Sequence, residues 1–224
     1  MKLEGKIIDF LGDSITEGTG VTDVANNRYD NIICREYGLK ARYNYGIGGT
    51  RIAHQMKPSE KPRYDLCFCG RAYNTNKDAD IIVVYGGVND YIHGDAYIGT
   101  PEDTTPATFC GGVNFLMKFL KERFEGKPVV FMTPARACLR GVTDEIPSAR
   151  PMKKEDAMPL IGYVNIIKEA GERHGVHVLD LYNLLPINPN DPEHYTKYTV
   201  DGLHFNDEGH KIIAKTLADF LLAL

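Results

Sequence analysis

The chain alternates between two patterns of apolar residues, one typical of buried strands and the other of amphipathic helices. Short runs that are apolar at nearly every position are typical of parallel strands buried on both faces. The clearest is the run from Ile81 to Tyr85. Five such runs predict strands, at residues 7–11, 41–45, 81–85, 128–132 and 176–180.

Between these runs, apolar residues recur at the three- and four-residue spacing that places them on one face of a helix. This spacing predicts helices at residues 27–37, 113–124, 159–174 and 207–222. Strands that alternate with helices predict a doubly wound α/β sandwich around a parallel sheet. Ligands in such folds bind beyond the carboxyl ends of the strands, so residues that follow a strand are the first candidates for chemistry.

Two long stretches show neither pattern. They cover residues 51–78 and residues 133–156, and both are rich in proline, glycine and charge. Loops of this length in a compact domain are often lids or binding loops. An ordinary surface excursion explains them equally well, and the sequence does not decide between the two interpretations.

Length and charge then narrow the class of protein. The 224 residues fit a single domain, residues 1–224, and a formal net charge of −4 without a basic stripe argues against a nucleic-acid partner. No run reaches the roughly 18 apolar residues of a membrane span, and the N-terminus leads into a strand rather than a signal peptide. The five cysteines show no disulfide-framework spacing, so we expect reduced thiols and a cytoplasmic location.

A serine follows the first predicted strand. The segment from Gly12 to Gly18 reads Gly-Asp-Ser-Ile-Thr-Glu-Gly, and a serine at a strand-to-helix turn can present its hydroxyl at the carboxyl edge of the sheet. The glycines allow tight turns, and the backbone N–H groups at a helix start can stabilise an anion. Taken alone, a serine in such a turn is more often a helix cap than a nucleophile.

An aspartate and a histidine precede the last predicted helix, in the segment Asp201-Gly202-Leu203-His204. A nucleophilic serine needs a base that takes its proton, and that base needs an orienting partner. An aspartate three residues before a histidine can accept a hydrogen bond from Nδ1, which leaves Nε2 to face a hydroxyl. The alternative is a capping aspartate beside a surface histidine.

Two further segments follow the second and third predicted strands. The glycines between Asn44 and Thr50 would let a backbone N–H approach a ligand closely. The segment Gly87-Val88-Asn89-Asp90 offers an asparagine amide that could donate to a developing oxyanion. Both segments are otherwise ordinary turn sequences, and we interpret Asp13 and Asp90 as turn-stabilising.

Together and in this order, the four segments resemble the SGNH hydrolase family, also called GDSL lipases and acylhydrolases. The four residues of the family name correspond to Ser14, Gly49, Asn89 and His204, and the resemblance spans nearly the whole chain. The first block reads Gly-Asp-Ser-Ile rather than Gly-Asp-Ser-Leu, a change that leaves the chemistry intact. The resemblance implies a flavodoxin-like three-layer α/β/α sandwich with a central five-stranded parallel sheet.

The resemblance also implies a two-step acyl transfer that needs no metal or organic cofactor. Ser14 would attack an ester carbonyl while His204 takes its proton and Asp201 orients the imidazole. The N–H groups of Ser14 and Gly49 and the side-chain amide of Asn89 would form the oxyanion hole. Because the imidazole must be neutral to act as the base, activity should fall below a pH of about 6.5.

The sequence defines the substrate less sharply than the reaction. The polar loops favour a small-molecule ester with a small acyl group, such as acetyl, on a polar alcohol such as a carbohydrate. Arg51 and His54, just past the Gly49 turn, and Arg136, after the fourth strand, could contact this substrate. Aromatic faces can stack on sugar rings. The tyrosines of the first half that could do so, unless core packing explains them, are Tyr43, Tyr45, Tyr64, Tyr73, Tyr91 and Tyr97.

Three alternatives stay open beside the small-ester hydrolase. A lysophospholipase or thioesterase would use the same residues on a longer acyl chain. A carbohydrate-binding module on this fold would have no need to keep all five catalytic and oxyanion residues. A flavodoxin-like nucleotide binder could hold a phosphate at the Gly-Asp-Ser turn, but it leaves the Asp201–His204 pair unexplained.

Overall fold

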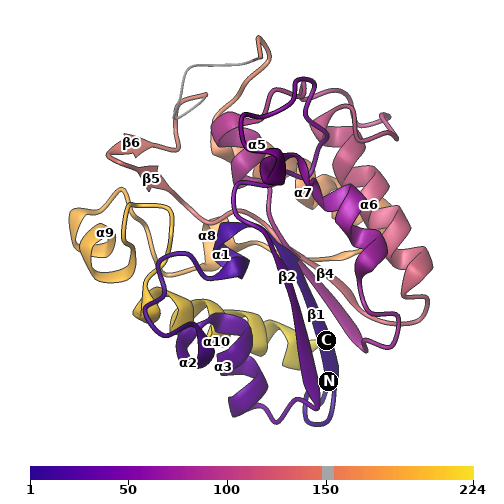
Figure 1. The fold of residues 1–224 in the computed structure, drawn as a ribbon, viewed down its shortest axis with the longest axis vertical. Helices are drawn as coiled ribbons and strands as arrows, with labels where there is room; N and C mark the ends of the chain where they lie inside the picture. The colour runs from indigo at the N-terminus through magenta and orange to yellow at the C-terminus, as the bar shows by residue number, and fades with distance from the viewer. Residues whose placement is uncertain (148–153) are drawn as a thin grey trace.

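A sheet of five parallel strands forms the centre of the fold (Figure 1). The structure is a computed structural model and describes residues 1–147 and 154–224. The strand order β2-β1-β3-β4-β7 places β1 between β2 and β3, where the direction of winding reverses. This arrangement confirms the expected parallel sheet. The strands are β1 Ile7–Gly12, β2 Ala41–Gly46, β3 Ile81–Tyr85, β4 Val129–Met132 and β7 His177–Leu179.

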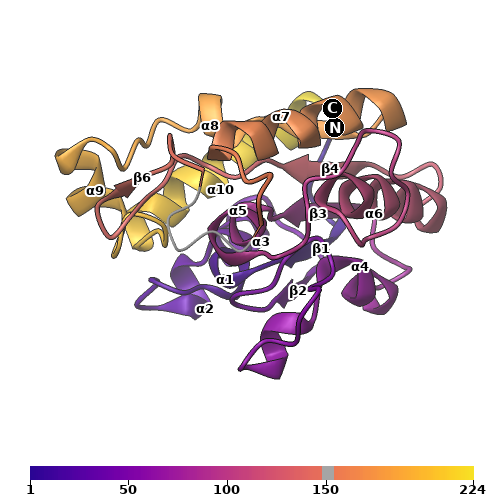
Figure 2. The same cartoon turned by 90° about the horizontal axis from the view of Figure 1, so that it is seen from above.

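Helices cover both faces of the sheet and complete a three-layer sandwich (Figures 1 and 2). Helices α3 and α10 pack together on one face, and α6 and α7 pack together on the other. In the described residues, no helix is long and apolar enough to cross a membrane. The α-helices are α1 Ser14–Glu17, α2 Val24–Asn27, α3 Tyr29–Glu36, α4 Phe68–Arg71, α5 Val88–His93, α6 Phe109–Arg123, α7 Leu160–His174, α8 Leu181–Leu184, α9 Pro192–Tyr198 and α10 Asp207–Ala223.

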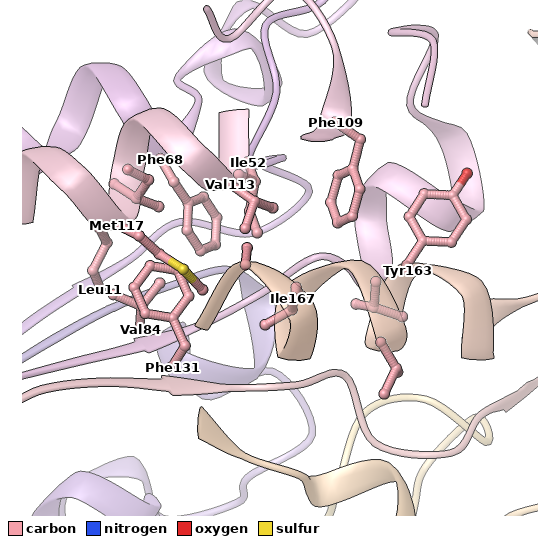
Figure 3. Packing of buried hydrophobic residues seen from close by; sticks show 14 of the residues in the cluster. Leu11, Ile52, Phe68, Val84, Phe109, Val113, Met117, Phe131, Tyr163 and Ile167 are labelled. Carbon is pink, nitrogen blue, oxygen red and sulfur yellow. The ribbon is translucent and has the colours of Figure 1, made fainter. Parts of the chain in front are cut away.

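Strand β3 shows why a continuous apolar run marks the middle of the sheet. All five of its residues are buried. Ile82 and Val84 belong to the core cluster under α6 and α7, whereas Ile81, Val83 and Tyr85 belong to the cluster under α3 and α10. Successive side chains of a strand point to opposite faces, so both faces demand apolar residues. Figure 3 shows the first cluster, in which Val84 packs among side chains from the strands and from the covering helices.

Helix boundaries follow local signals that apolar spacing does not carry. Helix α6 begins at Phe109, four residues before the predicted start, because Thr108 caps it by accepting a hydrogen bond from Gly111 N. The early turns contain Gly111 and Gly112, which interrupt the apolar pattern. A Cβ at Gly112 would lie 3.2 Å from Cα of Ala53, so the small residue allows a close approach of the loop.

The two long irregular stretches contain short elements of their own. The first holds the 3-10 helices Pro62–Asp65 and Ala72–Asn74 on either side of α4. The second holds a two-stranded antiparallel hairpin, β5 Cys138–Leu139 and β6 Val142–Thr143. Residues 148–153 of that stretch lie outside the described residues.

Asp9 is a carboxyl buried within strand β1, and burial raises its pKa to about 7. Its Oδ2 accepts a hydrogen bond from Asn76 N at 2.7 Å, whereas Oδ1 has no partner in the part of the chain that the structure describes. The native state therefore keeps a proton that the unfolded chain releases near the ordinary aspartate pKa of 3.8. Its contribution to stability is full below that pH and is lost as the pH rises to about 7.

We expect the substitution Asp9→Asn to weaken the fall of unfolding free energy between about pH 4 and pH 7. Each pH unit over which only the native state keeps the proton lowers stability by at most about 1.4 kcal/mol. Urea denaturation of both proteins across this range measures the slope. The exposed Asp219→Asn variant should keep the wild-type slope, and an unchanged slope in Asp9→Asn would contradict the assignment.

Candidate active site

Ser14 is the first residue of α1 and follows the end of β1 after a single residue, Asp13, at the carboxyl edge of the sheet. Asp13 caps this short helix, because its Oδ1 accepts a hydrogen bond from Ile15 N at 3.0 Å. Burial raises the pKa of Asp13 to about 6. Gly12 leaves no room for a side chain, since a Cβ there would collide with Thr16. The turn thus holds the Ser14 hydroxyl at a fixed place above the strand.

His204 and Asp201 lie in the turn before α10 and reach Ser14 across the sheet edge. The Oγ of Ser14 lies 2.9 Å from Nε2 of His204, and Nδ1 of His204 lies 2.8 Å from Oδ2 of Asp201. Burial alone would raise the pKa of Asp201, but hydrogen bonds from the ring and backbone N–H of His204 outweigh it and lower the pKa to about 2. A carboxylate only accepts, so Nδ1 carries the proton and Nε2 faces the serine hydroxyl as acceptor.

The β5–β6 hairpin supports the histidine turn. Cys138 N donates a hydrogen bond to Gly202 O at 2.8 Å, and Arg140 N donates to Asp201 O at 3.0 Å. Gly202 has a φ of +81°, and a side chain at this position would collide with the Cys138 carbonyl. Figures 1 and 2 both place the hairpin beside α9, which precedes this turn in the chain. The β5–β6 hairpin, which belongs to the second irregular stretch, therefore holds the backbone of the turn that carries Asp201 and His204.

Gly49 lies in the turn after β2 with a φ of +77°, a conformation that glycine adopts without strain. A Cβ at Gly49 would lie 2.5 Å from Cδ1 of Tyr64, whose ring covers the turn. Gly48 N donates to Oε2 of Glu17 at 2.8 Å and ties the turn to α1. Within residues 1–147 and 154–224, the N–H groups of Ser14 and Gly49 have no hydrogen-bond acceptor. Both remain available to a ligand.

Asp90 fixes the segment that follows the Gly49 turn. Its buried carboxylate accepts hydrogen bonds from Ile52 N at 2.9 Å and from Ala53 N at 3.0 Å. These bonds join the loop to α5, just as the hydrogen bond that Asp13 accepts from Ile15 N orders α1. The two aspartates thus make the turn-stabilising contacts that we expected from their positions.

Asn89 is the second residue of α5, and only 5% of its surface is exposed. Its Nδ2 donates to Thr50 O at 3.0 Å and to Oδ2 of Asp13 at 3.3 Å. A single cavity of about 1060 Å³ joins this amide to the other candidate residues. The lining includes all five candidate catalytic and oxyanion residues, Ser14, Gly49, Asn89, Asp201 and His204.

The three other candidates for substrate contact have different surroundings. Arg51 borders the cavity, but it is 2% exposed and its guanidinium bonds to groups of the protein itself, including Tyr64 O at 2.8 Å. Arg136 lies on a separate and much smaller cavity, with its guanidinium carbon 4.5 Å from the centre of the Tyr182 ring. His54 is exposed and lies outside the residues that line the large cavity.

The structure adds residues that sequence reasoning missed. His93 lies behind Asn89, and Arg63 binds Glu17 at 2.6 Å beside the Gly48 turn. Tyr64, already a candidate from the sequence, covers Gly49. The signal for His93 was its position four residues after Asn89, one helical turn away. In the described residues, no three His, Cys, Asp or Glu side chains gather in a way that could hold a metal ion.

A parallel α/β sandwich with a hydrogen-bonded serine, histidine and aspartate at its strand ends is an arrangement on which serine hydrolases are built. A model of the GDSL-like lipase/acylhydrolase family matches residues 10–212, and the chain belongs to this family. A comparison with curated proteins found no match.

Several solved structures share the fold. A protein from Lactobacillus plantarum is 29% identical, with 98% of each chain covered and a TM-score of 0.81. A protein from Agrobacterium tumefaciens, provisionally described as an arylesterase, is 18% identical, with 97% of this chain and 99% of that chain covered and a TM-score of 0.66. An acetyl xylan esterase is 22% identical, with 95% and 98% covered and a TM-score of 0.61. The last two likenesses are to the fold alone.

Proposed function

We propose that this acylhydrolase is a serine esterase that removes small acyl groups, acetyl above all, from polar alcohols such as carbohydrates. The observation that carries the proposal is the unbroken hydrogen-bond chain from Ser14 through His204 to Asp201. Such a chain makes a serine hydroxyl nucleophilic at neutral pH, because the imidazole takes the proton as the new bond forms.

The mechanism has two acyl-transfer steps. Ser14 Oγ attacks the ester carbonyl, its proton passes to His204 Nε2, and the tetrahedral oxyanion takes hydrogen bonds from Ser14 N, Gly49 N and Asn89 Nδ2. The imidazolium then gives its proton to the leaving alcohol and leaves an acyl-serine ester. Water attacks this ester with His204 again as base, which releases the acid and restores Ser14.

The walls of the cavity support a polar alcohol. Tyr64 and Tyr97 line it, and Tyr97 is 45% exposed, so aromatic faces are available to a sugar ring. Charged side chains also line it, among them Lys57, Lys61 and Arg63. Of the other tyrosines, Tyr91 is buried in the core. The likeness of the fold to that of an acetyl xylan esterase supports an acetylated carbohydrate as the substrate.

A longer acyl chain is the second candidate, and apolar residues of the same cavity favour it. Met56, Ile92 and Leu139 line the space together with the catalytic residues, and Met56 is 59% exposed. A chain of several methylenes could lie on these side chains, each buried CH₂ contributing about 0.8 kcal/mol. This would make the protein a lysophospholipase or a thioesterase.

Hydrolysis of p-nitrophenyl acetate beside the octanoate ester separates the two substrates. We expect a higher kcat/KM for acetate, together with release of acetate from acetylated sugars, and the Ser14→Ala variant corrects for spontaneous hydrolysis. A preference for octanoate would move the substrate to lipids or thioesters. No turnover of either model ester or of acetylated sugars would favour the binding module over the enzyme.

A further inference from the structure

Behind Asn89 lie two polar side chains, those of His93 and Arg51, that the acyl-transfer steps do not use, and with Asn89 they form a hydrogen-bonded chain. The Oδ1 of Asn89 lies 3.0 Å from Nε2 of His93, and Nδ1 of His93 lies 2.7 Å from NH1 of Arg51. Asn89 and His93 lie one turn apart on α5, whereas Arg51 comes from the loop after the Gly49 turn. Arg51 is almost fully buried. The chain thus joins two segments that each carry an oxyanion-hole donor.

The two ends of this chain fix the direction of every hydrogen bond in it. A guanidinium can only donate, so Nδ1 of His93 must accept and its Nε2 must carry the proton of the neutral ring. Nε2 then donates to Asn89, which makes the nearer amide atom the oxygen. At the far end, the carbonyl oxygen of Thr50 can only accept, and it lies 3.0 Å from Asn89 Nδ2. Donor and acceptor therefore agree at each link.

Arg51 is itself held in place from the opposite side. Its NH2 donates to Tyr64 O at 2.8 Å and to Oδ1 of Asp65 at 3.2 Å. Ser59 Oγ accepts from the same nitrogen at 3.2 Å and donates to Oδ1 of Asp65 at 2.6 Å. The segment that carries Tyr64, which covers Gly49, thus anchors the guanidinium. Arg51 links this covering segment to α5.

We propose that His93, oriented by Arg51, is a positioning residue that holds the Asn89 amide with its nitrogen toward the oxyanion. The proposal rests on the proposed esterase function. One N–H of Asn89 Nδ2 donates to Thr50 O, and the second, which donates to Oδ2 of Asp13 at 3.3 Å, is the one that would turn to the tetrahedral intermediate. Without His93 the amide oxygen loses its buried partner, and the amide gains freedom to rotate. A donor that is not held in advance stabilises a transition state less.

A double-mutant cycle tests whether His93 acts through Asn89. We expect Asn89→Ala to lower kcat by about 10²-fold and His93→Ala by about 10-fold, with little change in KM. The double variant should be no slower than Asn89→Ala alone, because the positioning residue then has nothing to position. Multiplied effects in the double variant would overturn the proposal. So would full activity of His93→Ala.

A conservative variant and a control variant distinguish the loss of a hydrogen-bond donor from a folding defect. His93→Gln retains an amide donor near the place of Nε2 and should recover most of the activity that His93→Ala loses. His177 is exposed at the start of β7, the last strand in the order of the sheet, and His177→Ala is the matched control. A His93→Gln variant as slow as His93→Ala, with both proteins melting like the wild type, would contradict a role as donor.

Nitrogen-15 NMR of the histidine rings determines the protonation of His93 in this hydrogen-bond chain without any substrate. We expect His93 in the neutral form with the proton on Nε2, and a proton on Nδ1 would overturn the proposal. Full activity of Asn89→Ala in a protein that Ser14→Ala inactivates would also overturn it and leave the esterase intact. If the wild type hydrolysed no ester, the proposed function would fail instead, whatever the NMR result.

Discussion

Replacing Ser14 with alanine should lower kcat for ester hydrolysis by about 10⁶-fold, the loss that follows removal of a nucleophile that acts as a unit with its base. The Oγ of Ser14, 2.9 Å from Nε2 of His204, is the atom that would carry the acyl group. Without this atom no acyl-serine intermediate can form. KM should change little, because the alanine removes no other contact to the cavity. Steady-state hydrolysis of p-nitrophenyl acetate measures this loss.

Covalent labelling gives a second readout of the same residue. A fluorophosphonate should modify the wild type once, on Ser14, and should leave Ser14→Ala unmodified. Thr196→Ala removes a hydroxyl of α9 that donates to Pro192 O at 3.0 Å, and it should retain both labelling and activity. More than about 1% of wild-type activity in a folded Ser14→Ala protein would remove the serine from the mechanism.

The sequence predicts the sheet well because each central strand is buried on both faces. The predicted run at 81–85 matches β3 residue for residue, and the other four predicted strands overlap observed ones. Packing on two sides leaves few polar positions in such a strand, Asp9 of β1 being one, so the pattern is nearly independent of the rest of the fold. Helix starts are harder to place, since the Thr108 cap and the glycines after it carry no apolar signal.

The candidate site likewise has contacts that the sequence indicates and contacts that depend on tertiary packing. Asp201 and His204 are three residues apart, so their contact is a local event that spacing can indicate. Ser14 and His204 are 190 positions apart, and only the common carboxyl edge of parallel strands suggests that they meet. Arg51 was a candidate for substrate contact because it follows the Gly49 turn. Its burial depends on the packing of residues 59–65, which no periodic pattern of apolar residues predicts.

These long-range contacts share one physical feature, the satisfaction of buried polar groups. The carboxylate of Asp90 is buried and accepts two backbone N–H groups of the loop, and the guanidinium of Arg51 is buried and donates to that loop and to His93. A buried polar group without a partner costs about 1–3 kcal/mol. The first irregular stretch is therefore ordered by its polar residues, although its composition is typical of a solvated surface.

The substitution Asp201→Asn should lower kcat by about 10⁴-fold while the fold persists. An asparagine amide can keep its oxygen on the N–H groups of Leu203 and His204, which Oδ1 of Asp201 accepts at 3.1 Å and 2.8 Å. Its NH₂ group would then face Nδ1 of His204 and could only donate. The ring would have to accept at Nδ1 and carry its proton on Nε2, where it could no longer take the proton of Ser14.

Comparison of kcat with melting temperature distinguishes this loss from a local unfolding of the turn. The backbone hydrogen bonds of the turn survive in Asp201→Asn, so its melting temperature should stay close to that of the wild type. The exposed Asp219→Asn variant should keep full activity, since it loses only a surface ion pair with Lys215. Because the pKa of Asp201 is lowered to about 2, its charge is constant throughout the neutral range. The comparison is made at pH 8, well above the ordinary histidine value of about 6.5, because removing a carboxylate beside an imidazole also changes the proton affinity of the ring. A loss of less than tenfold at that pH would show that the aspartate does not set the tautomer of His204.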